Sequence, residues 1–167
     1  MGAEDIPDPA VRAVFDAYPP AVRSALLGLR RLILDTAAET PGVGPIQEAL
    51  RWKQPAYLTS QSGSGTTLRI DALKGSSERY GLYVNCKTTL LESFRSLYAA
   101  ELTFEGERAL LFHVDRTPTP DVLRHCIALA LTYHRDKAMQ WRSTSGGGGL
   151  STSNNSARSP SNVSSAA

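Results

Sequence analysis

The chain has 167 residues, 41% of them hydrophobic, and a formal net charge of +2, which fits one domain with a proper core. The nearly balanced charge argues against a dedicated nucleic-acid binder, which usually carries a strong basic excess. No apolar run approaches the ~20 residues that span a bilayer, and the acidic Met1–Asp8 segment does not resemble a signal peptide. We therefore expect a cytoplasmic protein that binds neither nucleic acid nor membrane. Cys86 and Cys126 lie in apolar patterns typical of buried free thiols, although a disulfide between them stays open.

Two helices are predicted at the start of the chain. Asp8 and Pro9 are an N-cap and a first-turn proline for a short helix that ends near Ala17. Pro19-Pro20 then opens a helix over 20–39, whose apolar stripe consists of Val22, Leu26, Leu29 and Ile33. Leu27 and Leu34 lie off this stripe, so they pack against either the first helix or a second copy of the protein.

The middle of the chain alternates between short elements. Pro45 opens a predicted short helix over 46–51, and an extended segment follows over 52–58. After a Ser/Gly loop over 60–65, alternating apolar residues predict strands over 68–72 and 82–86. Thr89 and Glu92 match a capping box, which predicts a short helix to about Leu97.

The last elements are a hairpin and a helix. Strands that begin at Leu102 and Leu110 flank the turn Glu105-Gly106-Glu107, and Thr119-Pro120-Asp121 starts a helix to about Met139. The order predicts an α+β fold with a largely antiparallel sheet packed against the N-terminal and C-terminal helices. We expect residues 8–142 to form this domain, between a disordered N-terminus over 1–7 and a disordered Ser/Gly/Asn-rich tail over 143–167.

The predicted final helix contains two of the three histidines and one cysteine. His125 and His134 are nine residues apart, so they project to nearly opposite sides of a helix and cannot hold one metal ion. His125 falls on the solvent face. His134 falls in the apolar arc beside Leu123 and Ile127, either as a core-edge residue or as a group that contacts a ligand.

The segment from Trp52 to Tyr57 is the other candidate for binding. Trp52 and Tyr57 offer flat aromatic surface, and Lys53 offers a charge for an anionic ligand. The alternative is a packed strand in which Trp52 fills the core and Lys53 lies in water. The predicted ligand surface consists of Trp52, Lys53, Tyr57, Tyr83 and His134.

A metal site would need oxygen ligands for a hard cation such as iron. Asp35 and Glu39 stand four apart on the second helix, and Glu48 lies near in the sequence, so these three acids are the candidate metal ligands. A solvated helix face explains them equally well. No motif for nucleophilic catalysis is present, so no catalytic residue is predicted.

Several segments together resemble the YdhG-like domain, a bacterial family of unknown function. They are the long Leu/Arg helix near the N-terminus, Leu50-Arg51-Trp52-Lys53-Gln54-Pro55-Ala56-Tyr57, Tyr80-Gly81-Leu82-Tyr83-Val84-Asn85-Cys86, Phe104-Glu105-Gly106-Glu107-Arg108-Ala109-Leu110 and Ile127-Ala128-Leu129-Ala130-Leu131-Thr132-Tyr133-His134. The resemblance covers about residues 10–138. It implies helices packed on an antiparallel sheet and, in one branch, a frataxin-like iron chaperone.

Three functions remain as hypotheses. The first is a small non-catalytic cytoplasmic binding or accessory domain without a cofactor, a monomer or weak homodimer whose partner is an unknown small molecule or protein. The second is an intracellular iron chaperone that uses Asp35, Glu39 and Glu48. The third is an enzyme with a pocket around His134.

Overall fold

The computed structural model describes the backbone of residues 5–152 and the side chains of residues 5–143. Within these residues the fold is α+β, as predicted, and the chain divides after His134 into two compact units. The second unit contains most of the last helix. The elements in chain order are α1 Pro9–Ala17, α2 Pro20–Glu39, β1 Gln47–Arg51, β2 Gln54–Leu58, β3 Leu68–Ala72, β4 Arg79–Tyr83, α3 Leu90–Tyr98, β5 Thr103–Glu105, β6 Ala109–His113, α4 Pro120–Leu131 and α5 Tyr133–Thr152.

The six strands form one antiparallel sheet in the order β1-β2-β3-β4-β6-β5. Neighbouring strands in the sheet follow one another in the chain, except that α3 and β5 lie between β4 and β6. The β2–β3 ladder is short, with only Ala56↔Arg69 and Tyr57↔Leu68 in register. The β1–β2 hairpin is therefore attached to the rest of the sheet by few backbone hydrogen bonds.

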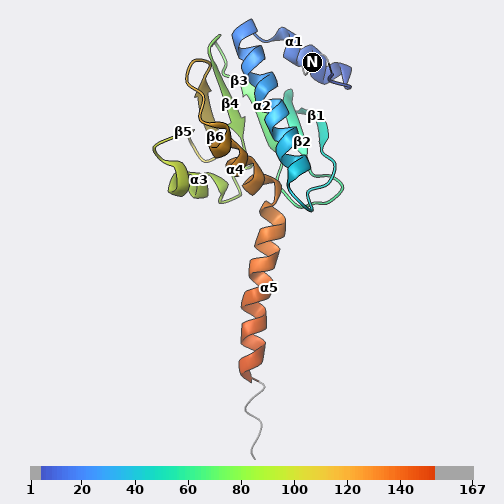
Figure 1. Cartoon of the computed structure of the whole chain (residues 1–167), viewed down its shortest axis with the longest axis vertical. Helices are drawn as coiled ribbons and strands as arrows, with labels where there is room; N and C mark the ends of the chain where they lie inside the picture. The colour runs from blue at the N-terminus through green and yellow to red at the C-terminus, as the bar shows by residue number, and fades with distance from the viewer. Residues whose placement is uncertain (1–4, 153–167) are drawn as a thin grey trace, which may run out of the picture. The chain divides into compact units, whose positions relative to one another are not determined.

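Helices α2 and α4 pack side by side on one face of this sheet (Figure 1). The predicted stripe of α2 is buried, and α4 contributes Cys126, Ile127 and Ala130, which have no exposed surface. Alternate sheet residues such as Leu68, Ile70 and Leu82 face the same core. Each fully buried Leu or Ile stabilises the fold by roughly 1.5–3 kcal/mol, so this layer carries most of the stability. Leu27 and Leu34 are partly buried against the same core.

The N-terminal segment is part of the core. The backbone N–H of Ala10 donates to Asp8 Oδ1 at 2.8 Å, so the predicted N-cap of α1 is present. Ile6 is 1% exposed, although the sequence predicts disorder over residues 1–7. Two hydrogen bonds hold this residue against the domain, because Arg12 donates from Nε and Nη2 to the Ile6 carbonyl at 3.2 and 2.6 Å. Residues 1–4 of the predicted disordered segment lie outside the described residues.

The prediction of a short helix over 46–51 is wrong, because residues 47–51 form β1. Glu48 and Leu50 are half-buried, and β1 pairs with β2 along its whole length. Six residues do not distinguish a helical from an alternating pattern. The strand predicted over 82–86 also differs, because β4 ends at Tyr83 and Cys86 is exposed. Cys126 is buried as expected, and both thiols are free.

The predicted helix from Thr119 to Met139 is divided in two after Leu131. Residues of the loop between β2 and β3 donate hydrogen bonds to the last carbonyls of α4. Thr66 N–H donates to Ala130 O at 2.9 Å, and Ser64 Oγ donates to Leu131 O at 2.7 Å. Gly65 lies so close that a Cβ atom there would be 2.3 Å from the Leu131 carbonyl carbon. The loop therefore ends α4, and α5 starts with a new helical register at Tyr133.

Helix α5 runs to Thr152, beyond Met139 and into the segment for which the sequence predicts disorder. It continues through Gly146–Gly149, although each glycine in a helix costs about 1 kcal/mol relative to alanine, and nothing in the structure explains this extension. The rest of the predicted tail, residues 153–167, lies outside the described residues. Over the described range, no helix combines the length and apolar character that crossing a bilayer requires.

Candidate functional site

The turn between β1 and β2 holds its backbone in an unusual conformation. Trp52 and Lys53 are the two central residues, with φ of 56° and 63°. A two-residue hairpin turn with positive φ at both positions normally uses Asn-Gly, because glycine and asparagine tolerate this conformation, whereas it costs other residues roughly 1–2 kcal/mol each. Such strain concentrates at functional sites. It presents the Trp52 side chain to solvent, 85% exposed.

Two adjoining hollows lie beside this tryptophan. Their volumes are about 290 and 400 Å³, and both are lined by Trp52, Arg69 and Arg108. The remaining lining residues are Arg51, Thr67, Asn85 and Cys86 in the first hollow, and Gln54 and Tyr83 in the second. The hollows therefore join the β1–β2 hairpin to the middle of the sheet.

The strand register explains why these side chains meet. Arg69 on β3 is directly opposite Tyr83 on β4, and Tyr83 is directly opposite Ala109 on β6. Their neighbours Leu68, Ile70 and Leu82 face the helices, so Arg69 and Tyr83 lie on the other face of the sheet. Arg108 immediately precedes β6 and reaches the same place. This uncovered face carries the hollows.

The hollows carry an excess of positive charge. Arg69 donates from Nη1 to Gln54 Oε1 at 2.7 Å, and its Cζ lies 5.8 Å from the centroid of the Tyr83 ring. Burial lowers the pKa of Arg69, and the charge of Arg108 lowers it further. Within residues 5–143, the Arg108 side chain makes no hydrogen bond or ion pair. No Asp or Glu occurs among the lining residues of these two hollows in the described part of the chain.

Asp71 is an acid on this face whose carboxylate already has partners. Asp71 accepts from the Tyr18 hydroxyl at Oδ1 and from Gln54 Nε2 at Oδ2, at 2.8 and 3.0 Å. Burial is the largest cause of the raised pKa of Tyr18, and the hydrogen bond to Asp71 adds to it. Asp71 thus orients Gln54, which in turn holds Arg69. This chain of hydrogen bonds positions one of the two arginines.

Of the five residues predicted to bind ligand, the structure brings two together. Trp52 and Tyr83 line the same hollow. Lys53 is exposed in the turn, and Tyr57 is fully buried. Trp52 is exposed, so it does not fill the core as the alternative expected. His134 is exposed at the start of α5, whereas the helical wheel placed it in the apolar arc; the break after Leu131 changes its direction. Neither Lys53, Tyr57 nor His134 lines the two hollows.

Sequence reasoning missed the three arginines Arg51, Arg69 and Arg108. The alternation of Leu68, Arg69 and Ile70 does place Arg69 on the face opposite the core. No such pattern exists for Arg51 or Arg108, because Arg51 is the last residue of β1 and Arg108 precedes β6. Their approach to Arg69 depends on how β1, β2 and β3 pair and on the pairing of β4 with β6.

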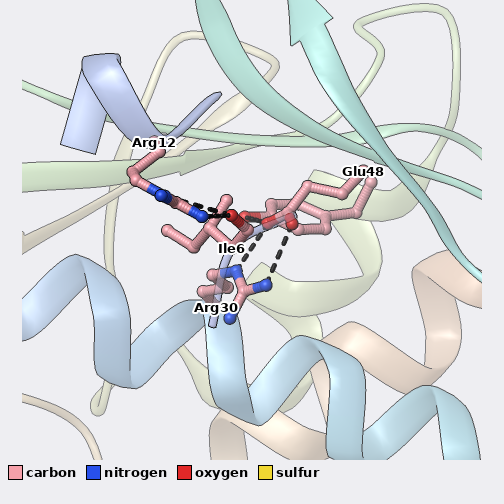
Figure 2. A network of polar contacts seen from close by, with 5 residues as sticks. Ile6, Arg12, Arg30 and Glu48 are labelled. Carbon is pink, nitrogen blue, oxygen red and sulfur yellow. Dashed lines mark hydrogen bonds and ion pairs between the residues drawn. The ribbon is translucent and has the colours of Figure 1, made fainter. Parts of the chain in front are cut away.

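Tyr57 belongs to a buried polar network on the helix side of the sheet. Its hydroxyl donates to Glu48 Oε2 at 2.8 Å, and Arg30 donates to both Glu48 oxygens at 2.6 and 2.9 Å. Figure 2 shows Arg30 pointing to Glu48, while Arg12 points to the carbonyl of Ile6. Burial, followed by the Glu48 charge, raises the pKa of Tyr57, and the hydrogen bond to Glu48 raises the pKa of Arg30.

The three predicted metal ligands do not form a common site. Asp35 and Glu39 are exposed on α2, whereas the carboxylate of Glu48 is held by Arg30 and Tyr57. In the part of the chain that the structure describes, no group of three His, Cys, Asp or Glu residues is arranged to hold a metal ion. His125 is exposed as expected, and its Nδ1 lies 2.6 Å from the Tyr98 hydroxyl. Burial raises the pKa of the Cys126 thiol to about 12.

Fold and site together define a small α+β protein with one helix-covered sheet face and one open face that carries an arginine-lined hollow. The chain matches no protein-family model, no curated protein and no solved structure. The resemblance to the YdhG-like domain therefore rests on the quoted sequence segments and stays an expectation.

Proposed function

We propose that this protein is a non-catalytic binding domain that holds a small molecule on the open face of its sheet. One observation carries this proposal: an exposed tryptophan on a strained turn stands beside a hollow lined by two arginines. A protein that needed only a stable hairpin would have Asn-Gly at this turn. The strained turn is therefore best explained by a ligand that contacts Trp52.

The lining residues favour binding over catalysis. The first hollow offers a hydroxyl on Thr67 and a thiol on Cys86 as potential nucleophiles. A nucleophile needs a neighbouring base, and the residues that line the two hollows in the described part of the chain include no histidine or carboxylate. Arginine does not serve as a base, because it stays protonated in proteins.

We further propose that the domain acts in the cytoplasm as a monomer or weak homodimer, that nucleic acid is not its partner, and that it belongs with YdhG-like domains. Two free cysteines, one of them exposed, support a reducing compartment. The iron-chaperone hypothesis has less support, because the Glu48 carboxylate is already bound by Arg30. The hypothesis of an enzyme that uses His134 also has less support, because His134 lines neither of the two hollows.

The test uses the two tryptophans, both exposed and far apart in the chain. Trp141→Phe leaves Trp52 as the only tryptophan, so its fluorescence reports on the hollow. We expect a screen of cellular metabolites against this variant to find a ligand that saturates the Trp52 signal. Binding of that ligand, measured by calorimetry, should be lost in Trp52→Ala and kept in Trp141→Ala. A metabolite that binds equally well to Trp52→Ala, or that the protein converts to a product, would contradict the proposal.

A further inference from the structure

We infer that the ligand is a planar ring joined to a phosphate or carboxylate, with the ring against Trp52 and the anionic oxygens between Arg69 and Arg108. This inference rests on the proposed function and names the chemistry of its ligand. Its two parts come from separate observations, one about charge and one about aromatic surface.

The positive charge comes from two arginines that line both hollows, and no carboxylate of the described residues lines either hollow. Arg69 and Arg108 repel each other, and of the hydrogen-bonding groups of Arg69 only Nη1 has a partner within residues 5–143. A guanidinium has five N–H donors in a planar fork that matches the oxygens of a carboxylate or phosphate. An anion between the two arginines would remove the repulsion and occupy these donors. Arg51, which lines the first hollow, adds a third positive charge.

The aromatic surface comes from Trp52, which both hollows share with the two arginines. Tyr83 does not offer a free ring face in the same way, because Arg69 lies over it. Trp52 remains 85% exposed, and a flat ring stacked on it would bury that surface. Arg51 and Gln54, which flank the two turn residues, are paired in the β1–β2 ladder, so the backbone that carries Trp52 is already ordered before a ligand binds.

The size of the site agrees with one small molecule. The hollows have volumes of about 290 and 400 Å³, and binding sites for small ligands occupy roughly 300–1,000 Å³. Asn85 places an amide on the wall of the first hollow, which is suited to the edge of a heterocycle or to a hydroxyl. The site therefore has one place for a ring, one for an anion and polar groups beside them.

Matched probes test the two parts separately in the Trp141→Phe protein, by Trp52 fluorescence and calorimetry at low and high salt. Adenosine 5′-monophosphate and indole-3-acetate carry a ring and an anion, one as phosphate and the other as carboxylate. Adenosine and indole keep the ring of each probe without its anion, and inorganic phosphate and acetate keep the anion without the ring. At least one of the two complete probes should bind more tightly than both of its own parts, with weaker binding at high salt. The complete probe that gains more affinity over its own neutral ring identifies phosphate or carboxylate as the anion.

Variants of single arginines locate the anion. Arg108→Gln should weaken the complete probe about 10- to 100-fold, the value of a lost charge-assisted hydrogen bond, and leave adenosine unchanged. The matched control is Arg79→Gln, since Arg79 is exposed on β4 and lines neither hollow. Both variants should keep the circular dichroism and melting temperature of the parent, because both side chains are exposed.

The outcomes separate the two proposals. If a neutral aromatic compound saturates Trp52 and Arg108→Gln does not change its affinity, the inference fails while the proposed function stands. If neither complete probe is bound more tightly than its parts, the inference is overturned. A single-stranded oligonucleotide that binds far more tightly than the mononucleotide would identify nucleic acid as the ligand and overturn both proposals.

Discussion

Glu48 shows how one residue acquires its role from its neighbours. The sequence suggests a solvated acid or a metal ligand, but the structure places its carboxylate between Arg30 and the Tyr57 hydroxyl. The side chains of Arg30 and Glu48 are 10% and 11% exposed. Because both charges are largely removed from water, each needs the other, and loss of one leaves a buried charge without a partner.

Removing one member of this pair should lower the free energy of unfolding more than removing both charges. We expect Arg30→Met to lower the free energy of unfolding by about 3–5 kcal/mol, since the largely buried Glu48 carboxylate loses its cationic partner. The double variant Arg30→Met with Glu48→Gln should be more stable than Arg30→Met alone, because the amide oxygen still accepts from Tyr57. Urea denaturation of the single and double variants measures both effects.

The exposed acid Asp35 provides the control for this comparison. Asp35→Asn should change the free energy of unfolding by no more than about 0.5 kcal/mol, as is usual for surface substitutions. A double variant that is less stable than Arg30→Met would show that the pair does not depend on mutual neutralisation.

At the scale of the elements, the loop between β2 and β3 determines where α4 ends. Its sequence Gly63-Ser64-Gly65 resembles a flexible linker, but Ser64 and Thr66 bind the last carbonyls of α4. Ser64 and Thr66 are each 5% exposed. The loop therefore packs closely on the domain and ends α4, so that α5 begins anew just before His134.

Substitution by alanine should have opposite effects on stability at Gly65 and at Gly28. Gly65→Ala forces a Cβ atom to 2.3 Å from the Leu131 backbone, so we expect a loss of about 1–3 kcal/mol or more as the loop or α4 shifts. Gly28 is an exposed residue inside α2, and a Cβ atom added there would have no neighbour within 4 Å. Gly28→Ala should therefore gain about 0.5–1 kcal/mol. Thermal denaturation checks both, and a Gly65→Ala protein of unchanged stability would mean that the loop does not pack closely on α4.

At the scale of the whole molecule, residues that are far apart in the chain pack into one core. Ile6 joins a single cluster that includes residues of α1, α2, the sheet and α4. Its carbonyl accepts from Arg12, as Figure 2 shows. The segment before α1 is thus a structural part of the domain.

Shortening this buried side chain should destabilise the whole domain. Ile6→Ala removes a side chain that is 1% exposed, so we expect a loss of about 2–5 kcal/mol from lost burial and the cavity left behind. Val14 is only partly buried, and Val14→Ala should cost less. A cooperative unfolding transition measured by circular dichroism would show the effect as a lower midpoint. An unchanged midpoint for Ile6→Ala would place the segment outside the cooperative unit.

Much of the fold could be predicted because the signals are local. Asp8-Pro9 and Pro19-Pro20 mark the starts of α1 and α2, and the apolar stripe of α2 runs from Val22 to Ile33. The alternation at Leu68 and Ile70 marks β3 and its two faces. Of the residues predicted to bind ligand, Trp52 and Tyr83 line one hollow, whereas Lys53, Tyr57 and His134 line neither hollow.

The sequence by itself determined the α+β class, both N-terminal helices, β3 and the β5–β6 hairpin, because each depends on caps, turns or periodicity within a few residues. Only the tertiary structure decided that residues 47–51 are a strand, that α4 stops at Leu131, and that Arg69 and Arg108 share a hollow with Trp52. Each of these depends on a partner distant in the chain: β2 and Arg30 for β1, the Ser64–Thr66 loop for α4, and strand register for the arginines. Such contacts form only when the chain closes on itself, and no local pattern records them.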